Sequence, residues 1–147
     1  MKQVLFLIFL FASTFLQAQD LKPLTWKFSA KKGANANEYI ITASASLQKE
    51  WHVFAPNPGG DGLLIPTEIS ITNKNAFKTI GALTPQRRPI TKEMEGIGMV
   101  NYYEGDIEFN IVVEAIKPTT IEGIITSQCC NDKMCLPPSD VPFKIKL

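Results

Sequence analysis

The sequence predicts an all-β protein, a sandwich or barrel of about nine short strands in a single domain. Three observations lead to this prediction. Apolar and polar residues alternate in short runs that recur roughly every 8–12 residues. The nine Gly and ten Pro residues supply many turns among 147 residues. No stretch after the first eighteen residues keeps the 3.6-residue period of an amphipathic helix.

The expected strands follow one another along the whole chain. Alternation is clearest in 38–47, where Tyr39, Ile41 and Ala43 share one face. The same pattern marks 107–113, 121–125 and 141–147. Shorter candidates lie at 25–29, 51–55, 67–72, 76–80 and 99–103. Two segments rich in Gly and Pro, 56–62 and 84–98, are expected to be long loops, which in compact domains often carry function.

Residues 1–18 have the features of an export signal. Lys2 gives a positive start, residues 4–16 form an apolar run, and Ala18 is a small residue before a plausible cleavage point. The run is shorter than the ~20 residues that span a membrane, and no later segment could span one. We expect a mature domain of residues 19–147, periplasmic or secreted, where disulfides persist.

Charge and motifs exclude several classes of function. Lys and Arg number 15 against 14 Asp and Glu, a net charge of +1, so no strong field exists to attract nucleic acid or an anionic membrane. The single histidine, His52, has no evident nucleophile partner and is expected in packing or a surface hydrogen bond. A hydrolase triad is therefore not expected, and no glycine-rich phosphate loop opens a helix.

All three cysteines lie within seven residues, Cys129 to Cys135. Residues 131–134 form a four-residue turn that would place Cys130 opposite Cys135 on antiparallel strands. Cross-strand Cα distances of ~4.5–5.5 Å fall inside the range that disulfides accept. Neighbouring strand residues point to opposite faces, so Cys129 is expected to be a small buried residue of the core.

The residues alone leave the role of this pair open. A disulfide that closes so short a loop removes little chain entropy, roughly 2 kcal/mol, but a small surface loop leaves it accessible to an attacking thiolate. Three thiolates with His52 or Met134 could in principle hold zinc or cuprous copper. Because a strand aims Cys129 and Cys130 apart, we expect neither a metal ion nor another cofactor.

The cysteine segment 128–138 (QCCNDKMCLPP) resembles the active-site loop of the N-terminal periplasmic domain of the thiol:disulfide interchange protein family DsbD. Residues 51–55, 60–62 and 65–69 resemble the early strand, the Gly-rich loop and the Pro-Thr strand of that family. The resemblance covers most of residues 26–147. It implies an immunoglobulin-like β-sandwich and a thiol:disulfide oxidoreductase activity that needs no cofactor.

The resemblance also implies roles for individual residues. Cys130 and Cys135 would be the redox pair, with Cys135 forming the mixed disulfide and Cys130 resolving it. A cap loop that shields the cysteines in the family corresponds to residues 92–96, so Met94 would be the shield and Glu93 would tune thiol protonation.

The family domain takes reducing equivalents from a thioredoxin-like domain fed by a membrane domain and passes them to periplasmic thiol proteins. We expect a stand-alone exported domain whose partners are thioredoxin-like periplasmic proteins or a membrane electron carrier. The alternative is a secreted immunoglobulin-like binding or assembly module in which Cys130–Cys135 is a structural disulfide.

Overall fold

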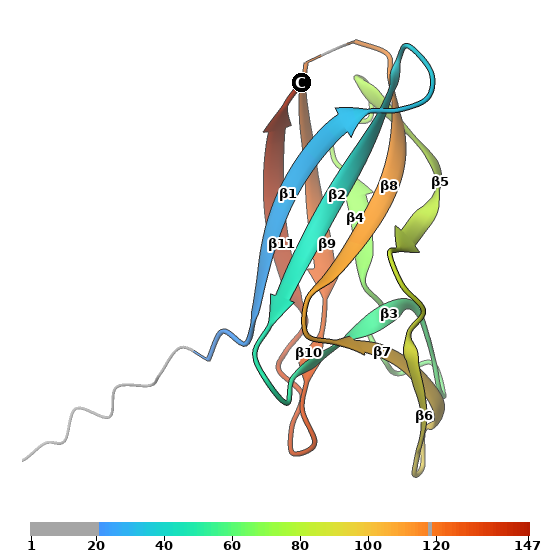
Figure 1. Ribbon diagram of the computed structural model, residues 1–147, viewed down its shortest axis with the longest axis vertical. Helices are drawn as coiled ribbons and strands as arrows, with labels where there is room; N and C mark the ends of the chain where they lie inside the picture. The colour runs from blue at the N-terminus through green and yellow to red at the C-terminus, as the bar shows by residue number, and fades with distance from the viewer. Residues whose placement is uncertain (1–20, 118) are drawn as a thin grey trace, which may run out of the picture.

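The computed structural model describes residues 21–117 and 119–147, and in them it contains eleven β-strands and no helix (Figure 1). The predicted export signal, residues 1–18, lies outside the described residues. The strands are β1 (Leu24–Lys32), β2 (Glu38–Leu47), β3 (His52–Gly59), β4 (Glu68–Ile71), β5 (Phe77–Pro85), β6 (Ile90–Met94), β7 (Gly98–Glu104), β8 (Ile107–Ala115), β9 (Thr120–Ser127), β10 (Cys129–Cys130) and β11 (Ser139–Lys146).

The strands form three antiparallel sheets, and one of them is covered by the other two. The long sheet has the order β1-β2-β8-β5, the upper sheet in Figure 1 the order β11-β9-β4, and the lower sheet the order β10-β3-β7-β6. One apolar core lies between the long and upper sheets, and a second lies between the long and lower sheets. The predicted all-β sandwich is confirmed.

The centre of the long sheet shows why the alternating segments fold as they do. Ala43 on β2 lies opposite Phe109 on β8, and both are fully buried. Side by side on the buried face, the small side chain leaves room for the large ring, so the pair fills the core without a void. On the other face of the same strands, Thr42 donates a 2.7 Å hydrogen bond to Asn110. One face therefore enters the core, and the other is only partly buried and carries this polar pair.

The upper core is closed by an aromatic pair and a glycine. The rings of Phe28 on β1 and Phe143 on β11 stack with centroids 4.5 Å apart. Gly123 on β9 lies opposite Phe143, and a Cβ at this position would overlap the Phe143 ring. The strand needs a glycine here because the aromatic ring fills the space that a side chain would take.

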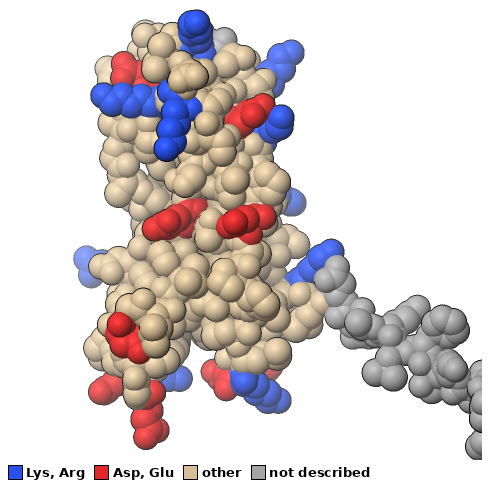
Figure 2. Space-filling model, turned by 180° about the vertical axis from the view of Figure 1, so that it is seen from behind, with Lys and Arg blue, Asp and Glu red and all other residues tan. Residues whose placement is uncertain are grey.

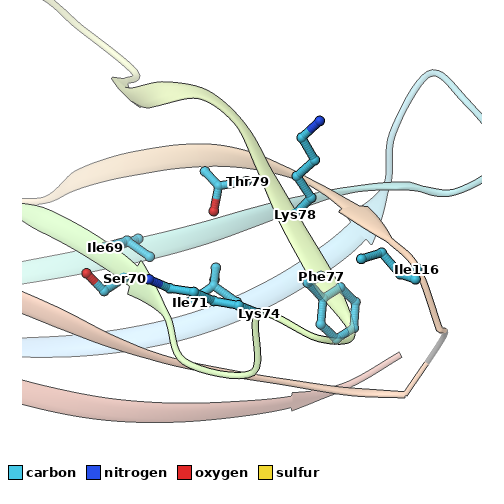
Figure 3. Close-up of a pocket in the computed structure, with 8 residues that line it drawn as sticks. All are labelled: Ile69, Ser70, Ile71, Lys74, Phe77, Lys78, Thr79 and Ile116. Atoms are coloured by element: carbon cyan, nitrogen blue, oxygen red, sulfur yellow. The ribbon is translucent and has the colours of Figure 1, made fainter.

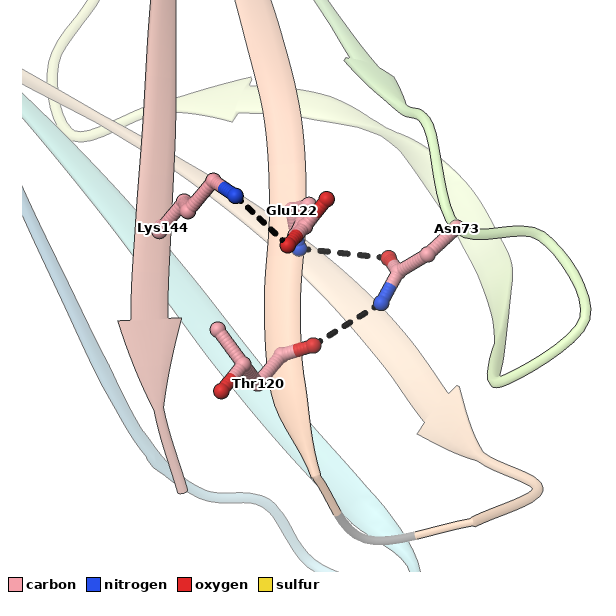
Figure 4. Close-up of polar contacts among 4 residues, drawn as sticks. All are labelled: Asn73, Thr120, Glu122 and Lys144. Carbon is pink, nitrogen blue, oxygen red and sulfur yellow. Dashed lines mark hydrogen bonds and ion pairs between the residues drawn. The ribbon is translucent and has the colours of Figure 1, made fainter.

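A side chain extends the upper sheet beyond the end of β4 (Figure 4). The Asn73 amide donates to the backbone oxygen of Thr120 at 2.8 Å and accepts from the backbone N–H of Glu122 at 3.2 Å. It thus satisfies two backbone groups of β9 where β4 no longer reaches. On the other side of β9, Lys144 forms a 2.9 Å ion pair with Glu122.

The prediction of about nine strands is too low by two. Strand β6 lies within 84–98, which the sequence indicated as a loop, and β10 holds only two residues. Four of the five β6 residues are exposed, so the strand has no buried face and no alternating pattern to reveal it. β3 also runs to Gly59, inside the predicted loop 56–62.

The chain changes sheets at Gln128, and this places the cysteines. β9 ends at Ser127 in the upper sheet, whereas Cys129 and Cys130 pair with Val53 and His52 of β3 in the lower sheet. The Gln128 side chain donates a 3.2 Å hydrogen bond to the backbone oxygen of Leu136, which holds the two arms of the cysteine loop together.

Candidate active site

The structure joins Cys130 and Cys135 in a disulfide, the pairing that the spacing predicted. Residues 131–134 form the expected turn, closed by a 2.9 Å hydrogen bond from the Asn131 N–H to the Met134 carbonyl. The Asn131 side chain accepts bonds from the backbone N–H groups of Lys133 and Met134, each 2.9 Å long. The Cα atoms of the two cysteines lie 4.0 Å apart, closer than the simple antiparallel estimate.

The two sulfur-bearing residues differ sharply in exposure. Cys130 is 2% exposed and packs among Phe54, Val100 and Tyr102 on the outer face of the lower sheet. Cys135 is exposed at the far side of the turn. Cys135 is therefore the end of the disulfide that solvent can reach, and Cys130 is the end enclosed by the protein.

A groove of about 360 Å³ runs beside the disulfide, between the cysteine turn and the β6–β7 hairpin. Figure 2 shows this end of the molecule hollowed between protruding loops. Besides both cysteines, its lining residues are His52, Phe54, Leu64, Lys92, Glu93, Met94, Glu95, Ile97, Asn131 and Asp132. The structure thus brings all four residues singled out from the sequence, Cys130, Cys135, Met94 and Glu93, to one groove.

The β6–β7 hairpin packs against the apolar cluster around the buried cysteine. Met94 and Ile97 pack against the apolar cluster that contains Cys130. The turn between them is tight: the Ile97 N–H donates to the Met94 carbonyl at 3.1 Å, and Gly96 has a φ of 76°. Few residues other than glycine adopt that backbone conformation. Met94 is half-buried under this turn, whereas Glu93 is exposed at the rim.

His52 is a groove residue that the sequence analysis assigned to packing or a surface hydrogen bond. It is 7% exposed and lies opposite Cys130 across the β3–β10 pair. Its ring contacts Tyr102 and Phe54, with centroids 4.7 and 5.6 Å away. The packing part of the expectation is correct. Its place beside the disulfide could not be found without knowing that β10 pairs with β3.

The environment of His52 favours the neutral imidazole. Burial lowers the pKa of His52 below its usual value of 6.5. The nearby carboxylates of Glu104 and Asp132 act in the opposite direction, and Lys92 adds to the lowering. The net effect leaves the ring uncharged at neutral pH and able to accept a proton.

Cys129 is buried, as the sequence predicted, and takes no part in the groove. It is 6% exposed and lies opposite Val53, on the core side of the lower sheet. Burial raises the pKa of its thiol to about 11. Within residues 21–117 and 119–147, no cluster of three or more His, Cys, Asp or Glu side chains could hold a metal ion.

A larger cavity of about 570 Å³ lies away from the cysteines, between the edge strands β4 and β5 (Figure 3). Ile69, Ile71, Phe77 and Ile116 give it an apolar lining, with Lys74 and Lys78 at its border. None of its lining residues can carry thiol chemistry, so size alone does not mark the candidate site in this fold.

Two further features concern the surroundings of the domain. In the part of the chain that the structure describes, no helix has the length and apolar character needed to cross a bilayer. On the face seen in Figure 2, acidic and basic side chains are interspersed rather than gathered into a patch of one sign.

Comparison with known proteins identifies relatives of this chain. The sequence profile of the family described as "Thiol:disulfide interchange protein DsbD, N-terminal" matches residues 17–146. Among curated protein sequences, none matches.

Two solved structures share its fold. The N-terminal periplasmic domain of ScsB from Proteus mirabilis is 18% identical over 88% of this chain, with a TM-score of 0.63, and the match spans 48% of that protein, about half its length. The N-terminal domain of DsbD from Neisseria meningitidis, in the reduced form, is 17% identical over 85% of this chain and 86% of that one, with a TM-score of 0.57. The shared fold confirms the predicted immunoglobulin-like β-sandwich.

Proposed function

The chain belongs to the family of DsbD N-terminal thiol:disulfide interchange domains, and from this premise we propose that it exchanges disulfides through Cys130 and Cys135. Reducing equivalents would pass from a thioredoxin-like periplasmic protein or a membrane electron carrier to periplasmic protein thiols. Residues 1–18 would act as the export signal, cleaved near Ala18, that brings residues 19–147 to the periplasm.

One observation carries the proposal: the disulfide has one exposed and one buried end, beside an open groove. Exchange requires in-line attack by a thiolate on one sulfur while the other leaves. An exposed Cys135 offers the sulfur to be attacked, and a buried Cys130 stays next to it to reverse the step. A purely structural disulfide has no need of this asymmetry.

The reaction then follows in two halves. In the first, a donor thiolate attacks Cys135 Sγ, the Cys130–Cys135 bond breaks, and its electron pair leaves on Cys130 Sγ. A second donor thiolate attacks the donor sulfur and frees Cys135, so the domain holds two thiols and the donor a disulfide. In the second half, the Cys135 thiolate attacks a substrate disulfide. Cys130 then attacks Cys135 Sγ, restoring the bond and releasing the reduced substrate.

The β6–β7 hairpin would control access to the pair. Met94 lies over the cluster around Cys130, and its flexible thioether can move aside when a partner docks. Glu93, at the groove rim, would add negative charge near the thiols and so disfavour a thiolate in the unbound domain.

The reduction potential of the Cys130–Cys135 couple tests the function. The mature chain is equilibrated with dithiothreitol mixtures, quenched by alkylation, and mapped by mass spectrometry. We expect a value between about −270 and −120 mV, the range of exchange proteins. A value below about −300 mV would mark a structural disulfide and favour the alternative, a secreted binding or assembly module.

Single cysteine variants test the assignment of roles. Cys130→Ser should trap a mixed disulfide between Cys135 and a protein substrate, whereas Cys135→Ser should form none. Cys129→Ala is the matched control and should exchange at the normal rate. Normal turnover by Cys130→Ser would show that Cys130 is not the resolving cysteine.

A further inference from the structure

His52 lies beside the buried sulfur of the exchange pair, and we propose that it accepts the proton of the Cys130 thiol when Cys130 attacks. This inference rests on the proposed function and adds to it the group that activates the resolving cysteine. His52 and Cys130 are direct partners in the β3–β10 ladder. Directly opposite residues on antiparallel strands share a face, with Cβ atoms roughly 4.5–5.5 Å apart, and both residues line the same groove.

Cys130 needs such help because of its surroundings. It is 2% exposed among Phe54, Val100 and Tyr102, so water cannot readily take its proton. Burial in apolar surroundings disfavours a thiolate, and the thiolate is the nucleophile in exchange. A resolving cysteine in this position requires a base within the protein.

His52 is the base of suitable strength in the groove. Imidazole is the side chain whose ordinary titration falls between pH 5 and 8, and this chain has one histidine. The ammonium group of Lys92 has no free electron pair with which to accept a proton. Carboxylates are much weaker bases than imidazole. The ionisable side chains that line the groove or act on His52 are Lys92, Glu93, Glu95, Glu104, Asp132, Cys130 and Cys135.

The groups around His52 also stabilise the imidazolium that forms when it takes the proton of Cys130. His52 is neutral at rest because burial lowers its pKa, so it can accept a proton. Once it does, the Glu104 carboxylate across the β3–β7 pair and the Asp132 carboxylate in the turn stabilise the imidazolium. The positive charge on His52, on β3, thus lies near two carboxylates, one on β7 and one in the cysteine turn.

The step balances without another reactant. From the mixed disulfide, Cys130 Sγ attacks Cys135 Sγ while its proton passes to the His52 ring. The Cys130–Cys135 bond forms, the bond from Cys135 to the partner breaks, and the partner leaves as a thiolate. The imidazolium then gives its proton to that thiolate or to water. In the reverse direction, His52 returns the proton to Cys130 as it leaves.

The test separates resolution from the first attack. Reduced protein is mixed with dithiobis(nitrobenzoate), and thionitrobenzoate release is followed from pH 5 to 9. The first phase reports attack by Cys135, and the second reports the attack of Cys130 on the mixed disulfide. We expect the wild-type second phase to rise at acidic pH and level off near neutrality, as a neutral histidine base requires.

His52→Gln should slow the second phase about 100-fold at pH 7 and leave the first phase unchanged. Its second phase should rise with pH as the thiol ionises and approach the wild-type rate at pH 9. A second phase with wild-type rate and pH profile, or equal slowing of both phases at every pH, would overturn the role of His52. Absence of a second phase in the wild-type protein would instead overturn the proposed exchange function.

A surface variant tests the same idea without touching the packed ring. Glu104 is exposed, and its carboxylate raises the pKa of His52. Glu104→Gln should therefore move the acidic rise of the second phase to lower pH. Glu114→Gln, an exposed carboxylate on β8, is the matched control and should leave the profile in place. An unmoved profile in Glu104→Gln would contradict the proposal.

Discussion

Cys129 lies opposite Val53 on the core side of the lower sheet, whereas the next residue, Cys130, faces the groove on the other side. Two adjacent cysteines thus occupy different environments because successive strand residues point in opposite directions. The free cysteine is separated from the Cys130–Cys135 disulfide by the sheet itself.

The first prediction concerns the reactivity of Cys129. Because burial raises its pKa to about 11, only about one molecule in a thousand carries its thiolate at pH 8. In the native reduced protein, mass mapping after iodoacetamide treatment should find Cys135 labelled and Cys129 unlabelled. Urea should expose Cys129 to labelling. Rapid labelling of Cys129 in the native protein would show that the lower sheet is open.

The second prediction concerns the β6–β7 hairpin beside the disulfide. Met94→Ala removes a side chain that packs against the Cys130 cluster, so dithiothreitol should reduce the disulfide several-fold faster. Met99→Ala is the control, since Met99 is on the same hairpin but 54% exposed. Equal rates in the two variants would mean that Met94 does not shield the pair.

The third prediction concerns acid stability. The folded pKa of His52 lies below its unfolded value, so the unfolded chain binds the proton more readily. The His52 contribution to stability is complete above the unfolded pKa near 6.5 and declines as the pH falls through it towards the folded pKa. The slope is at most about 1.4 kcal/mol per pH unit.

His52→Phe keeps an aromatic ring and cannot titrate. Urea unfolding of both proteins at pH 7.5 and 5.5 should show a smaller loss of stability in the variant. The same loss in both would contradict a lowered pKa.

The fourth prediction concerns the upper core. Gly123→Ala places a methyl group against the Phe143 ring and the Ser70 backbone oxygen, and should cost about 2–3 kcal/mol of stability. Phe143→Leu alone should cost about 1 kcal/mol. Because the smaller side chain makes room, the double variant should lose less than the sum of the two, as measured by denaturant unfolding. Simple additivity would show that the ring is not what excludes a side chain at position 123.

The parts of this fold that alternate with period two could be predicted from the sequence. Ala43 and Phe109 lie in such runs, and their strands were placed correctly. The hairpin strand β6 could not be found, because its side chains face solvent and carry no pattern. Proximity in sequence also sufficed for Cys130 and Cys135, which are separated by a short turn.

The position of His52 beside the disulfide could not be predicted from proximity in the sequence. It is far along the chain from Cys130, and the two meet only because the chain leaves the upper sheet at Gln128 and pairs with β3. That change of sheet has no signature in a local window of sequence. Side chains that long-range strand pairing brings together can be identified only once that pairing is known.

The same change of sheet places the disulfide groove at one end of the molecule and the upper core at the other. The cysteine turn follows β10 of the lower sheet, and His52 and the β6–β7 hairpin belong to that sheet, whereas the upper core contains none of them. In the proposed exchange, lifting the hairpin would break contacts at this end and leave Phe28, Gly123 and Phe143 in place. Such an opening would be a local event, far less costly than unfolding, and the rest of the sandwich would keep its structure through each round of the proposed exchange.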